Sequence, residues 1–341
     1  MKSDFPILLL ALCEPAKVLA LSGVVRRLKH EIPHARITLV TSKLAAELFQ
    51  DDDGVDEIQA FEGAIFNLKA LGALSELSRR SWGLLVDIGP TMISRMIRSK
   101  TRFVLDSNDP AGPLEQICRK LALDPEEVKP ELKVSPAREA QVRTFLDAHG
   151  RGIAPLIVIA PGATWLGRKW PTERYAVLAT KLMRENGPFS NHNLLILGTQ
   201  ADHDTALALR MATPRALVME LTGKLDLLSA YAAIRHGAAF IGNDEIWLHL
   251  AAATGVPTFG LLGPSEDGDA PMGDNVHIVR GPRRFTDIRA VDPKLKQNVC
   301  HMLDLSIDKV YDSIAIATPE PVAEGDDTLA DMGEFKELGH A

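Results

Sequence analysis

Two kinds of hydrophobic pattern alternate along the chain. Short runs of consecutive apolar residues, such as PILLLAL at residues 6–12, are followed by segments in which apolar residues recur every three or four positions. The first pattern is typical of strands buried on both faces of a parallel sheet, and the second is typical of amphipathic helices. Their alternation predicts a parallel sheet covered by helices on both faces.

The first half of the chain contains enough of these units for one doubly wound domain. After the strand at 6–12, four apolar residues fall on one face of a predicted helix: Val18, Leu21, Val25 and Leu28. The remaining predicted elements are strands at residues 35–41, 82–89 and 102–106, and a helix at residues 42–49.

The pattern weakens between residues 107 and 154, and a domain boundary is predicted there. A helix at 135–150 begins with Ser135 as its N-cap and Pro136 at its first helical position, and it ends at Gly150. We therefore assign residues 1–150 to an N-terminal domain.

The alternation then begins again and predicts a second doubly wound domain at residues 151–317. Its predicted strands are residues 155–160, 193–198, 216–220 and 238–242, with one more strand before residue 264, and its helices are residues 171–186, 202–212 and 226–236. Residues 318–341 are acidic and poor in large apolar side chains, so we expect a mobile tail.

Composition and charge narrow the class of protein. Of the 341 residues 46% are hydrophobic and 24% are charged, which is typical of a globular protein, and the net charge of −7 does not favour a nucleic-acid partner. Three cysteines, far apart in the chain, indicate neither a disulfide framework nor a zinc site. No apolar run approaches the ~20 residues that span a bilayer. We expect a cytoplasmic protein with at most a peripheral contact at the inner face of the cytoplasmic membrane.

Candidate chemistry lies at the ends of three predicted strands in the second domain. The segments are APGATWLGRKWP at 160–171, LGTQADHD at 197–204 and GNDEIWLH at 242–249. In open parallel sheets ligands bind beyond the carboxyl ends of the strands, where the first N–H groups of the helices attract phosphate. A hydroxyl at Thr164, cations at Arg168 and Lys169, and Asp244 with His249 together predict a diphosphate or sugar-nucleotide site.

Each of these residues also has an ordinary structural interpretation. Arg168 and Lys169 taken alone are typical solvated charges, Asp244 is a typical helix N-cap, and His249 suits a hydrogen-bonded core histidine. The convergence of such residues at three successive strand ends favours the binding site.

The spacing of these motifs resembles glycosyltransferase family 9, the heptosyltransferases of the lipopolysaccharide core. The resemblance runs from PGA, five residues and KWP through LTGK to GND, HLAAATGVP and LLGP, and it extends from RRLKHEIPHARI near the N-terminus to residues 299–314. It implies two Rossmann-like domains that face a central cleft, the glycosyltransferase type B architecture. The nucleotide sugar would bind the C-terminal domain, and the anomeric centre would be inverted with no metal and no other cofactor.

The resemblance also assigns residues to the donor. Thr164 and Arg168 fall where the family contacts the donor diphosphate, with Arg168 in place of its usual Lys, and Asp202 matches an acidic residue that holds the ribose. Residues 223–225, which include Lys224 and Leu225, match the base pocket. Asp244 and His249 match an Asp and a His around the diphosphate.

Two segments depart from the family pattern in ways that bear on donor binding and catalysis. Glu245 and Ile246 stand where small residues usually let backbone N–H groups approach the phosphates, and a carboxylate there repels a diphosphate unless a cation intervenes. Lys17 stands where the family has an Asp as general base. Glu14, three residues earlier in the same loop, is the candidate replacement, although a carboxylate near a turn is also an ordinary surface feature.

The sequence therefore favours an inverting, metal-independent glycosyltransferase. It would move a heptose-like sugar from a nucleoside-diphosphate sugar to lipopolysaccharide or another glycan or lipid-linked acceptor. Because of the two departures, the alternative is a catalytically silent family member that binds a glycan, a nucleotide or a protein. A sugar-nucleotide epimerase of the same architecture fits the motif spacing less well.

Overall fold

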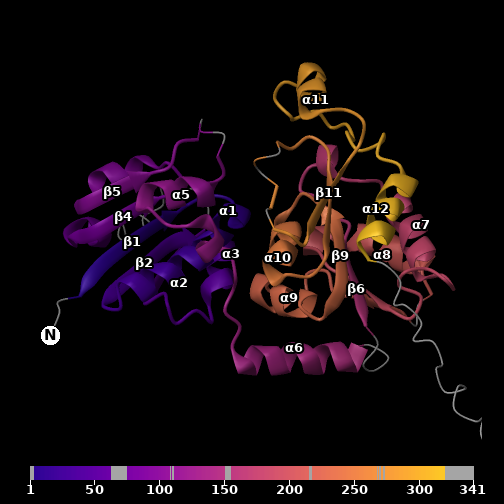
Figure 1. The fold of residues 1–341 in the computed structure, drawn as a ribbon, viewed down its shortest axis with the longest axis horizontal. Coiled ribbons are helices and arrows are strands. Elements are labelled where there is room, and N and C mark those ends of the chain that lie inside the picture. The colour runs from indigo at the N-terminus through magenta and orange to yellow at the C-terminus, as the bar shows by residue number, and fades with distance from the viewer. Residues whose placement is uncertain are drawn as a thin grey trace, which may run out of the picture.

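The computed structural model describes residues 4–62, 75–149, 155–214 and 217–318, apart from residues 108, 110, 267, 269 and 272. Within these ranges the chain forms two parallel sheets flanked by helices, one in each half (Figure 1). The predicted fold class is confirmed. The predicted boundary at residue 150 and the predicted tail beyond Thr318 lie outside the described residues.

The first sheet has the strand order β3-β2-β1-β4-β5 in the described part of the chain. Its strands are β1 (Phe5–Ala11), β2 (Ala35–Ser42), β3 (Glu57–Phe61), β4 (Trp82–Asp87) and β5 (Ser99–Val104). Its helices are α1 (Pro15–Leu19), α2 (Leu21–Glu31), α3 (Lys43–Ala46), η1 (Glu47–Phe49), η2 (Met92–Met96), α5 (Pro113–Leu121) and η3 (Pro125–Val128). The chain winds from β1 to one side through β2 and β3, and to the other side through β4 and β5. The order therefore reverses between β1 and β4.

The second sheet has the order β11-β10-β9-β6-β7-β8, so its reversal lies between β6 and β9. Its strands are β6 (Leu156–Ala160), β7 (Asn193–Ile196), β8 (Val218–Glu220), β9 (Gly237–Asn243), β10 (Thr258–Leu262) and β11 (Val276–Arg280). The helices are η4 (Leu166–Arg168), α7 (Thr172–Met183), η5 (Gln200–Asp202), α8 (His203–Ala212), α9 (Leu227–Ile234), α10 (Ile246–Thr254), α11 (Phe285–Val291) and α12 (Ile307–Ala317).

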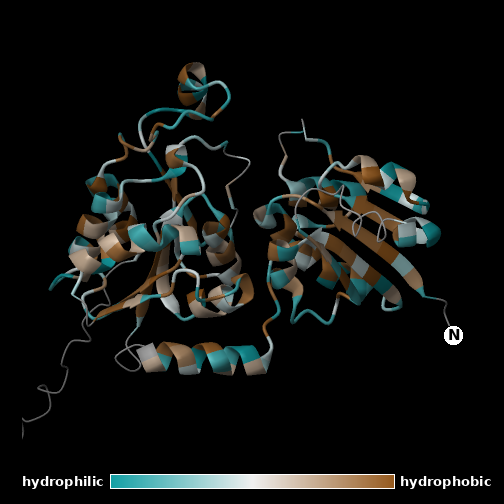
Figure 2. Cartoon of the chain, turned by 180° about the vertical axis from the view of Figure 1, so that it is seen from behind, coloured by the Kyte–Doolittle hydropathy of each residue, from teal (hydrophilic) through white to brown (hydrophobic). Residues whose placement is uncertain are grey.

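The central strands are buried as their sequences predict. Residues 7–10 of β1 and 157–159 of β6 are fully buried, and Figure 2 shows apolar residues along the strands of both sheets. The four apolar residues predicted to share a helix face are also buried, but that helix is divided into α1 and α2 at Ala20.

The sequence-based prediction was wrong or incomplete at the sheet edges. It contained neither β3 nor β11, and it placed β5 three residues too late. All three are edge strands, and their burial patterns include exposed or half-exposed positions. An edge strand has solvent on one side, so its sequence lacks the continuous apolar run that marks a central strand.

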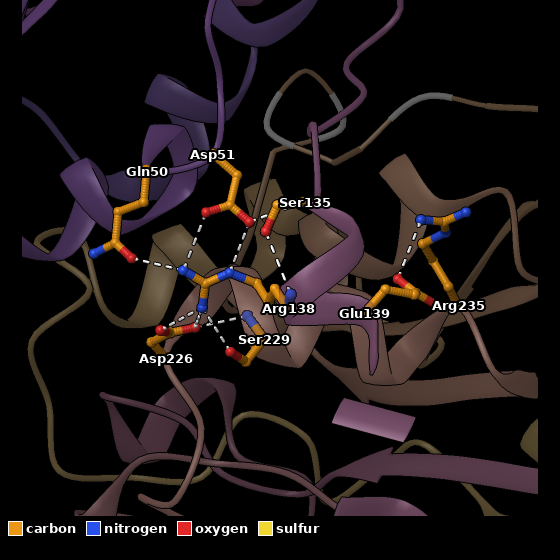
Figure 3. A network of polar contacts seen from close by, with 8 residues as sticks. All are labelled: Gln50, Asp51, Ser135, Arg138, Glu139, Asp226, Ser229 and Arg235. Atoms are coloured by element: carbon orange, nitrogen blue, oxygen red, sulfur yellow. Dashed lines mark hydrogen bonds and ion pairs between the residues drawn. The ribbon is translucent and has the colours of Figure 1, made fainter. Parts of the chain in front are cut away.

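Helix α6 (Pro136–His149) connects the domains and runs along the lower edge of Figure 1. Near its start, Arg138 contacts both halves of the protein (Figure 3). Toward the first domain, its Nε donates to Asp51 at 3.0 Å and one Nη donates to Gln50 at 2.9 Å. Toward the second domain, the other Nη donates to Asp226 and to Ser229, at 2.8 Å each. One guanidinium therefore joins the segment after η1 to the start of α9.

Three further contacts support this junction. The carboxylate of Glu139, one residue after Arg138, lies 3.0 Å from the imidazole of His236 and 3.6 Å from the guanidinium of Arg235, both just beyond the end of α9. The N–H of Leu227 donates to the Glu47 carboxylate at 2.9 Å, which bonds the two domains directly. Helices α6 and α9 thus fasten the domains on the side shown in Figure 3.

We predict that the Arg138 junction makes the protein acid-sensitive. Burial alone would raise the pKa of Asp51, but the bonds from Arg138 and Ser135 hold it at about 2 instead of 3.8. Because the pKa is lowered on folding, this contribution of about 2 kcal/mol is present above pH 3.8 and is lost as the pH falls toward 2.

Arg138→Met should therefore destabilise the protein by about 3–5 kcal/mol at pH 7, because it leaves two partly buried carboxylates without their cation. It should also weaken the loss of stability between pH 4 and pH 2. Denaturant unfolding as a function of pH measures both effects. Arg284→Met is the control, because that arginine is 82% exposed and pairs only locally with Asp287. Equal losses in the two variants would contradict a special role for Arg138.

Candidate functional site

The reversal points of the two sheets open into one cleft of about 1380 Å³. The first sheet contributes the loop after β1, and the second contributes the loops after β6, β7 and β9. Ten of the residues singled out in the sequence line this cleft: Glu14, Lys17, Thr164, Arg168, Lys169, Asp202, Asp244, Glu245, Ile246 and His249. Ligands bind beside such reversal points in open α/β sheets, because adjacent loops there separate to opposite faces.

Asn243, at the end of β9, holds the loops of the second domain in place. Its amide nitrogen donates to the carbonyl oxygens of Pro161 and Gly162 at 3.0 Å each, and its amide oxygen accepts from the N–H of Trp170 and the hydroxyl of Tyr175. These four bonds use all the donors and acceptors of the Asn243 side chain, which is buried. Sequence reasoning did not include it among the site residues, although the GND motif contains it.

Asp244 lies at the centre of a charged group on the cleft wall. It is 5% exposed and accepts a hydrogen bond from the Ser265 hydroxyl. The Nε2 atom of His249 is 3.7 Å from one of its oxygens, and an Arg168 Nη atom is 3.8 Å from the other. Helix α10 has Glu245 at its N-cap, so the alternative role of Asp244 as the cap is wrong. Ser265, which follows the LLGP motif, was not predicted.

Burial and hydrogen bonding act in opposite directions on Asp244. Burial would raise the pKa of its carboxyl, but the contact with His249, the hydrogen bond from Ser265 and the charge of Arg168 outweigh burial and lower that pKa. Asp244 is therefore an ionised group that orients His249 and Arg168.

Glu245 reaches across the cleft wall to the loop after β6. The backbone N–H and the hydroxyl of Thr164 both donate to the same Glu245 oxygen, at 2.8 Å each. Burial and the neighbouring Asp244 raise the pKa of Glu245, and the bonds from Thr164 and the charge of Arg168 offset this only in part. Glu245 thus makes a specific contact with the loop after β6, and its expected repulsion of a diphosphate stays a prediction.

The two cations after Thr164 differ in what they contact. The guanidinium of Arg168 is one-third exposed, and its buried Nε atom has no hydrogen-bond partner among the described residues. The exposed part of the guanidinium can therefore donate to a ligand, whereas the buried Nε is not accessible to one. The ammonium group of Lys169 instead donates to the Thr205 hydroxyl near the start of α8.

Asp202 lines the cleft but also has a structural role. One of its oxygens accepts from the N–H and the hydroxyl of Thr199 at 2.8 Å each, in a capping box. A side chain at Gly162 would collide with this carboxylate, because an ideal Cβ would lie 2.1 Å from its other oxygen. This packing explains why the PGA loop carries a glycine.

Lys224 and Leu225 are not among the described residues that line the cleft. The ammonium group of Lys224 donates to the backbone carbonyl of Glu220 at 2.6 Å and contacts its carboxylate at 3.1 Å. The suggested base pocket at residues 223–225 stays a prediction.

On the opposite wall, Glu14 and Lys17 are exposed at the start of α1. Glu14 occupies the N-cap position, but its side chain makes no capping hydrogen bond. Its carboxylate is therefore not committed to the helix. The structure thus places a carboxylate and an ammonium group from the first domain opposite the loops of the second.

The described residues contain no group of three or more His, Cys, Asp or Glu side chains that could hold a metal ion. Cys13, Cys118 and Cys300 are all unpaired. None of the helices in the described ranges combines the length and hydrophobicity that spanning a bilayer requires.

Comparison with known sequences gives a family. The profile of glycosyltransferase family 9 (heptosyltransferase) matches residues 114–296. The chain is 30% identical over 160 residues to lipooligosaccharide heptosyltransferase 2 of Haemophilus influenzae, which covers 45% of each protein. It is 30% identical over 168 residues to lipopolysaccharide heptosyltransferase 2 of Escherichia coli, which covers 48% of this chain and 46% of the relative. The match thus spans about half the length of these curated relatives.

Comparison with solved structures extends over nearly the whole chain. A glycosyltransferase family 9 protein of Veillonella parvula superposes with a TM-score of 0.78 at 17% identity, over 93% of this chain and 98% of the other. The ADP-heptose lipopolysaccharide heptosyltransferase II of E. coli superposes with a TM-score of 0.70 at 20% identity, over 92% and 98%. At these identities the likeness shows a shared fold of two Rossmann-like domains.

Proposed function

Because the chain belongs to glycosyltransferase family 9, we propose that it transfers a sugar from a nucleoside-diphosphate sugar to a glycan or lipid-linked acceptor. The observation that carries the proposal is the meeting of two sheet reversal points in one cleft. Thr164, Arg168 and Asp244 line this cleft on one side, and Glu14 and Lys17 line it on the other. A transferase needs both walls, because it must hold a donor and an acceptor at one point.

The second domain would bind the donor. The hydroxyl and N–H of Thr164 and the free donor capacity of Arg168 suit the diphosphate, and Asp244 with His249 would orient Arg168 and the sugar. Lys169 would add positive charge at the same wall, and Asp202 would hold the ribose with the oxygen that does not bond Thr199.

The first domain would bind the acceptor and supply the base. In an inverting transfer, the acceptor hydroxyl attacks the anomeric carbon on the face opposite the diphosphate. The bond from that carbon to the diphosphate oxygen breaks, and Glu14 takes the hydroxyl proton. Arg168 would stabilise the negative charge that develops on the leaving diphosphate, so the charge would need no metal. Lys17 would hold an anionic group of the donor or acceptor as a compact positive charge.

The names of the sequence relatives support a more specific proposal for the sugar and the acceptor. They are lipopolysaccharide and lipooligosaccharide heptosyltransferases, which favours a heptose-like sugar and a lipopolysaccharide acceptor for this chain. Such an acceptor is lipid-linked, which is consistent with a cytoplasmic protein in peripheral contact with the membrane.

Calorimetric titration of the protein with ADP, GDP and UDP, together with turnover of the matching nucleotide sugars, tests the proposal. We expect one of the nucleotides to bind and its sugar to be transferred. Binding of none of the three would contradict a nucleoside-diphosphate donor.

Arg168→Ala should weaken binding of that nucleotide by about 1.5–3 kcal/mol, the range for a charge-assisted hydrogen bond. The control is Arg184→Ala, because Arg184 is exposed at the end of α7 and does not line the cleft. It should leave the affinity unchanged. If the two variants bind equally well, Arg168 does not contact the diphosphate.

A further inference from the structure

One contact in the cleft joins a potential ligand-binding group to the protein itself. Thr164 has two hydrogen-bond donors that reach the cleft, its N–H and its hydroxyl, and one oxygen of Glu245 accepts both at 2.8 Å. Glu245 occupies the N-cap position of α10, where a carboxylate commonly bonds the first N–H groups of its own helix. It makes no such bond. Its side chain instead spans the gap between the loops after β9 and β6.

The Glu245 carboxylate thus has the position and bonding of a bound oxyanion. A phosphate oxygen would need the same two donors, and it would also be attracted by Arg168. Two anions cannot share this pair of donors at hydrogen-bond distance, because their charges repel and the donors are already used. A ligand that uses the Thr164 donors therefore requires the Glu245–Thr164 contact to open.

We propose that Glu245 is an internal competitor for the diphosphate of the ligand: it occupies the Thr164 donors in the empty cleft and leaves them when the diphosphate binds. This inference rests on the proposed function for the identity of the ligand. It assigns to Glu245 control over donor affinity, a role opposite to that of a residue that simply contacts the donor.

The charged groups around Glu245 determine whether its carboxyl group takes up a proton when the diphosphate displaces it from Thr164. Asp244 is adjacent in the chain, Arg168 approaches from η4, and His249 faces Asp244 from within α10. Asp202 and Lys169 line the same side of the cleft, and Glu14 and Lys17 line the other. The pKa of Asp244 is lowered, whereas burial raises the pKa of Glu245. Of the two neighbouring carboxyl groups, Glu245 is therefore the one that accepts a proton.

Displacement should consequently be coupled to proton uptake. A diphosphate beside Glu245 adds negative charge and raises the pKa of this carboxyl further, so the complex binds more protons than the free protein. Affinity then rises as the pH falls toward the pKa of Glu245, which lies above its ordinary value of 4.5, and it falls at higher pH. The nucleotide titrates as well, so only the difference between variants reports on Glu245.

The experiment is titration of ADP, GDP, UDP and inorganic pyrophosphate into the wild type and Glu245→Gln at pH 5.5 and pH 8. At pH 8 the variant should bind the preferred nucleotide and pyrophosphate about 10-fold to 100-fold more tightly, because a neutral amide competes less well for the Thr164 donors. The advantage should shrink at pH 5.5. Glu245→Ser combined with Ile246→Gly should show the same gain at pH 8.

Glu126→Gln is the matched control. It removes one negative charge from the lining of the same cleft, at a glutamate that pairs with Lys129. We expect its affinities to stay within about threefold of the wild type, as for an exposed pair.

The outcomes separate this proposal from the proposed function. Equal or weaker binding by Glu245→Gln at pH 8, with the wild type binding a nucleotide, overturns the competitor and leaves the transferase. Tighter pyrophosphate binding by Glu245→Gln without any nucleotide binding supports the competitor and contradicts the nucleotide-sugar donor. If no probe binds any variant, both proposals are wrong. Thermal unfolding of each variant confirms that it is folded.

Discussion

Glu14→Gln should lower turnover by about 10²–10⁴-fold, which is the range for loss of general-base assistance. Nucleotide affinity should stay near that of the wild type. The reason is geometric. Glu14 is exposed on the cleft wall opposite Thr164 and Arg168, and its side chain is not used to cap α1. Glutamine keeps the size of the side chain but cannot take the proton of an acceptor hydroxyl.

Steady-state turnover with the nucleotide sugar and a lipid-A-core acceptor measures this effect, with calorimetry for nucleotide affinity. Glu115→Gln provides the control, because Glu115 lines the same cleft from α5 and pairs with Arg119 at 3.7 Å. Full turnover by Glu14→Gln would remove Glu14 from catalysis.

Lys17→Asp separates an enzyme from a catalytically silent relative. A protonated lysine cannot act as the base, so an active wild type would depend on Glu14 and would gain nothing from the aspartate. An inactive wild type together with an active Lys17→Asp variant would instead identify the alternative, a family member that binds its ligands without transferring a sugar.

Asn243→Ala should destabilise the protein by about 3–4 kcal/mol, because it leaves several buried polar groups without partners. The affected groups are the carbonyls of Pro161 and Gly162, the N–H of Trp170 and the hydroxyl of Tyr175. The variant should also lose nucleotide binding, since these bonds position the loop that carries Thr164. Denaturant unfolding and calorimetry measure the two effects.

A second variant keeps this prediction testable if the first fails to fold. Asn243→Asp can still accept from Trp170 and Tyr175, but its buried carboxyl faces the two carbonyl oxygens and must stay protonated, so this variant should be more stable at pH 5 than at pH 8 and should release at least one of the two carbonyls. Asn193→Ala is the control. Asn193 is also buried, but its amide nitrogen has no partner among the described residues, so its loss should cost less. Equal losses for Asn243→Ala and Asn193→Ala would contradict the anchoring role.

The local apolar pattern was sufficient to predict which strand ends contribute residues to the cleft. Thr164, Asp244 and His249 each follow a central strand, and central strands carry the continuous apolar runs that a sequence displays plainly. Because the carboxyl ends of parallel strands share one edge of a sheet, the clustering of these residues in a cleft followed from the pattern. Lys224 and Leu225 were placed by resemblance alone, and they do not line the cleft.

The alternation of apolar runs and amphipathic segments by itself determined the fold class and the strand ends that carry the site, because burial imposes a local period on each central element. Only the tertiary structure decided the edge strands, the junction at Arg138, the anchoring by Asn243 and the contact between Thr164 and Glu245. These features depend on strand order and on hydrogen bonds between polar groups about 70 to 90 residues apart in the chain. The spacing of apolar residues shows which face of a helix or strand is buried. It contains no information about which polar group from another element a side chain will contact.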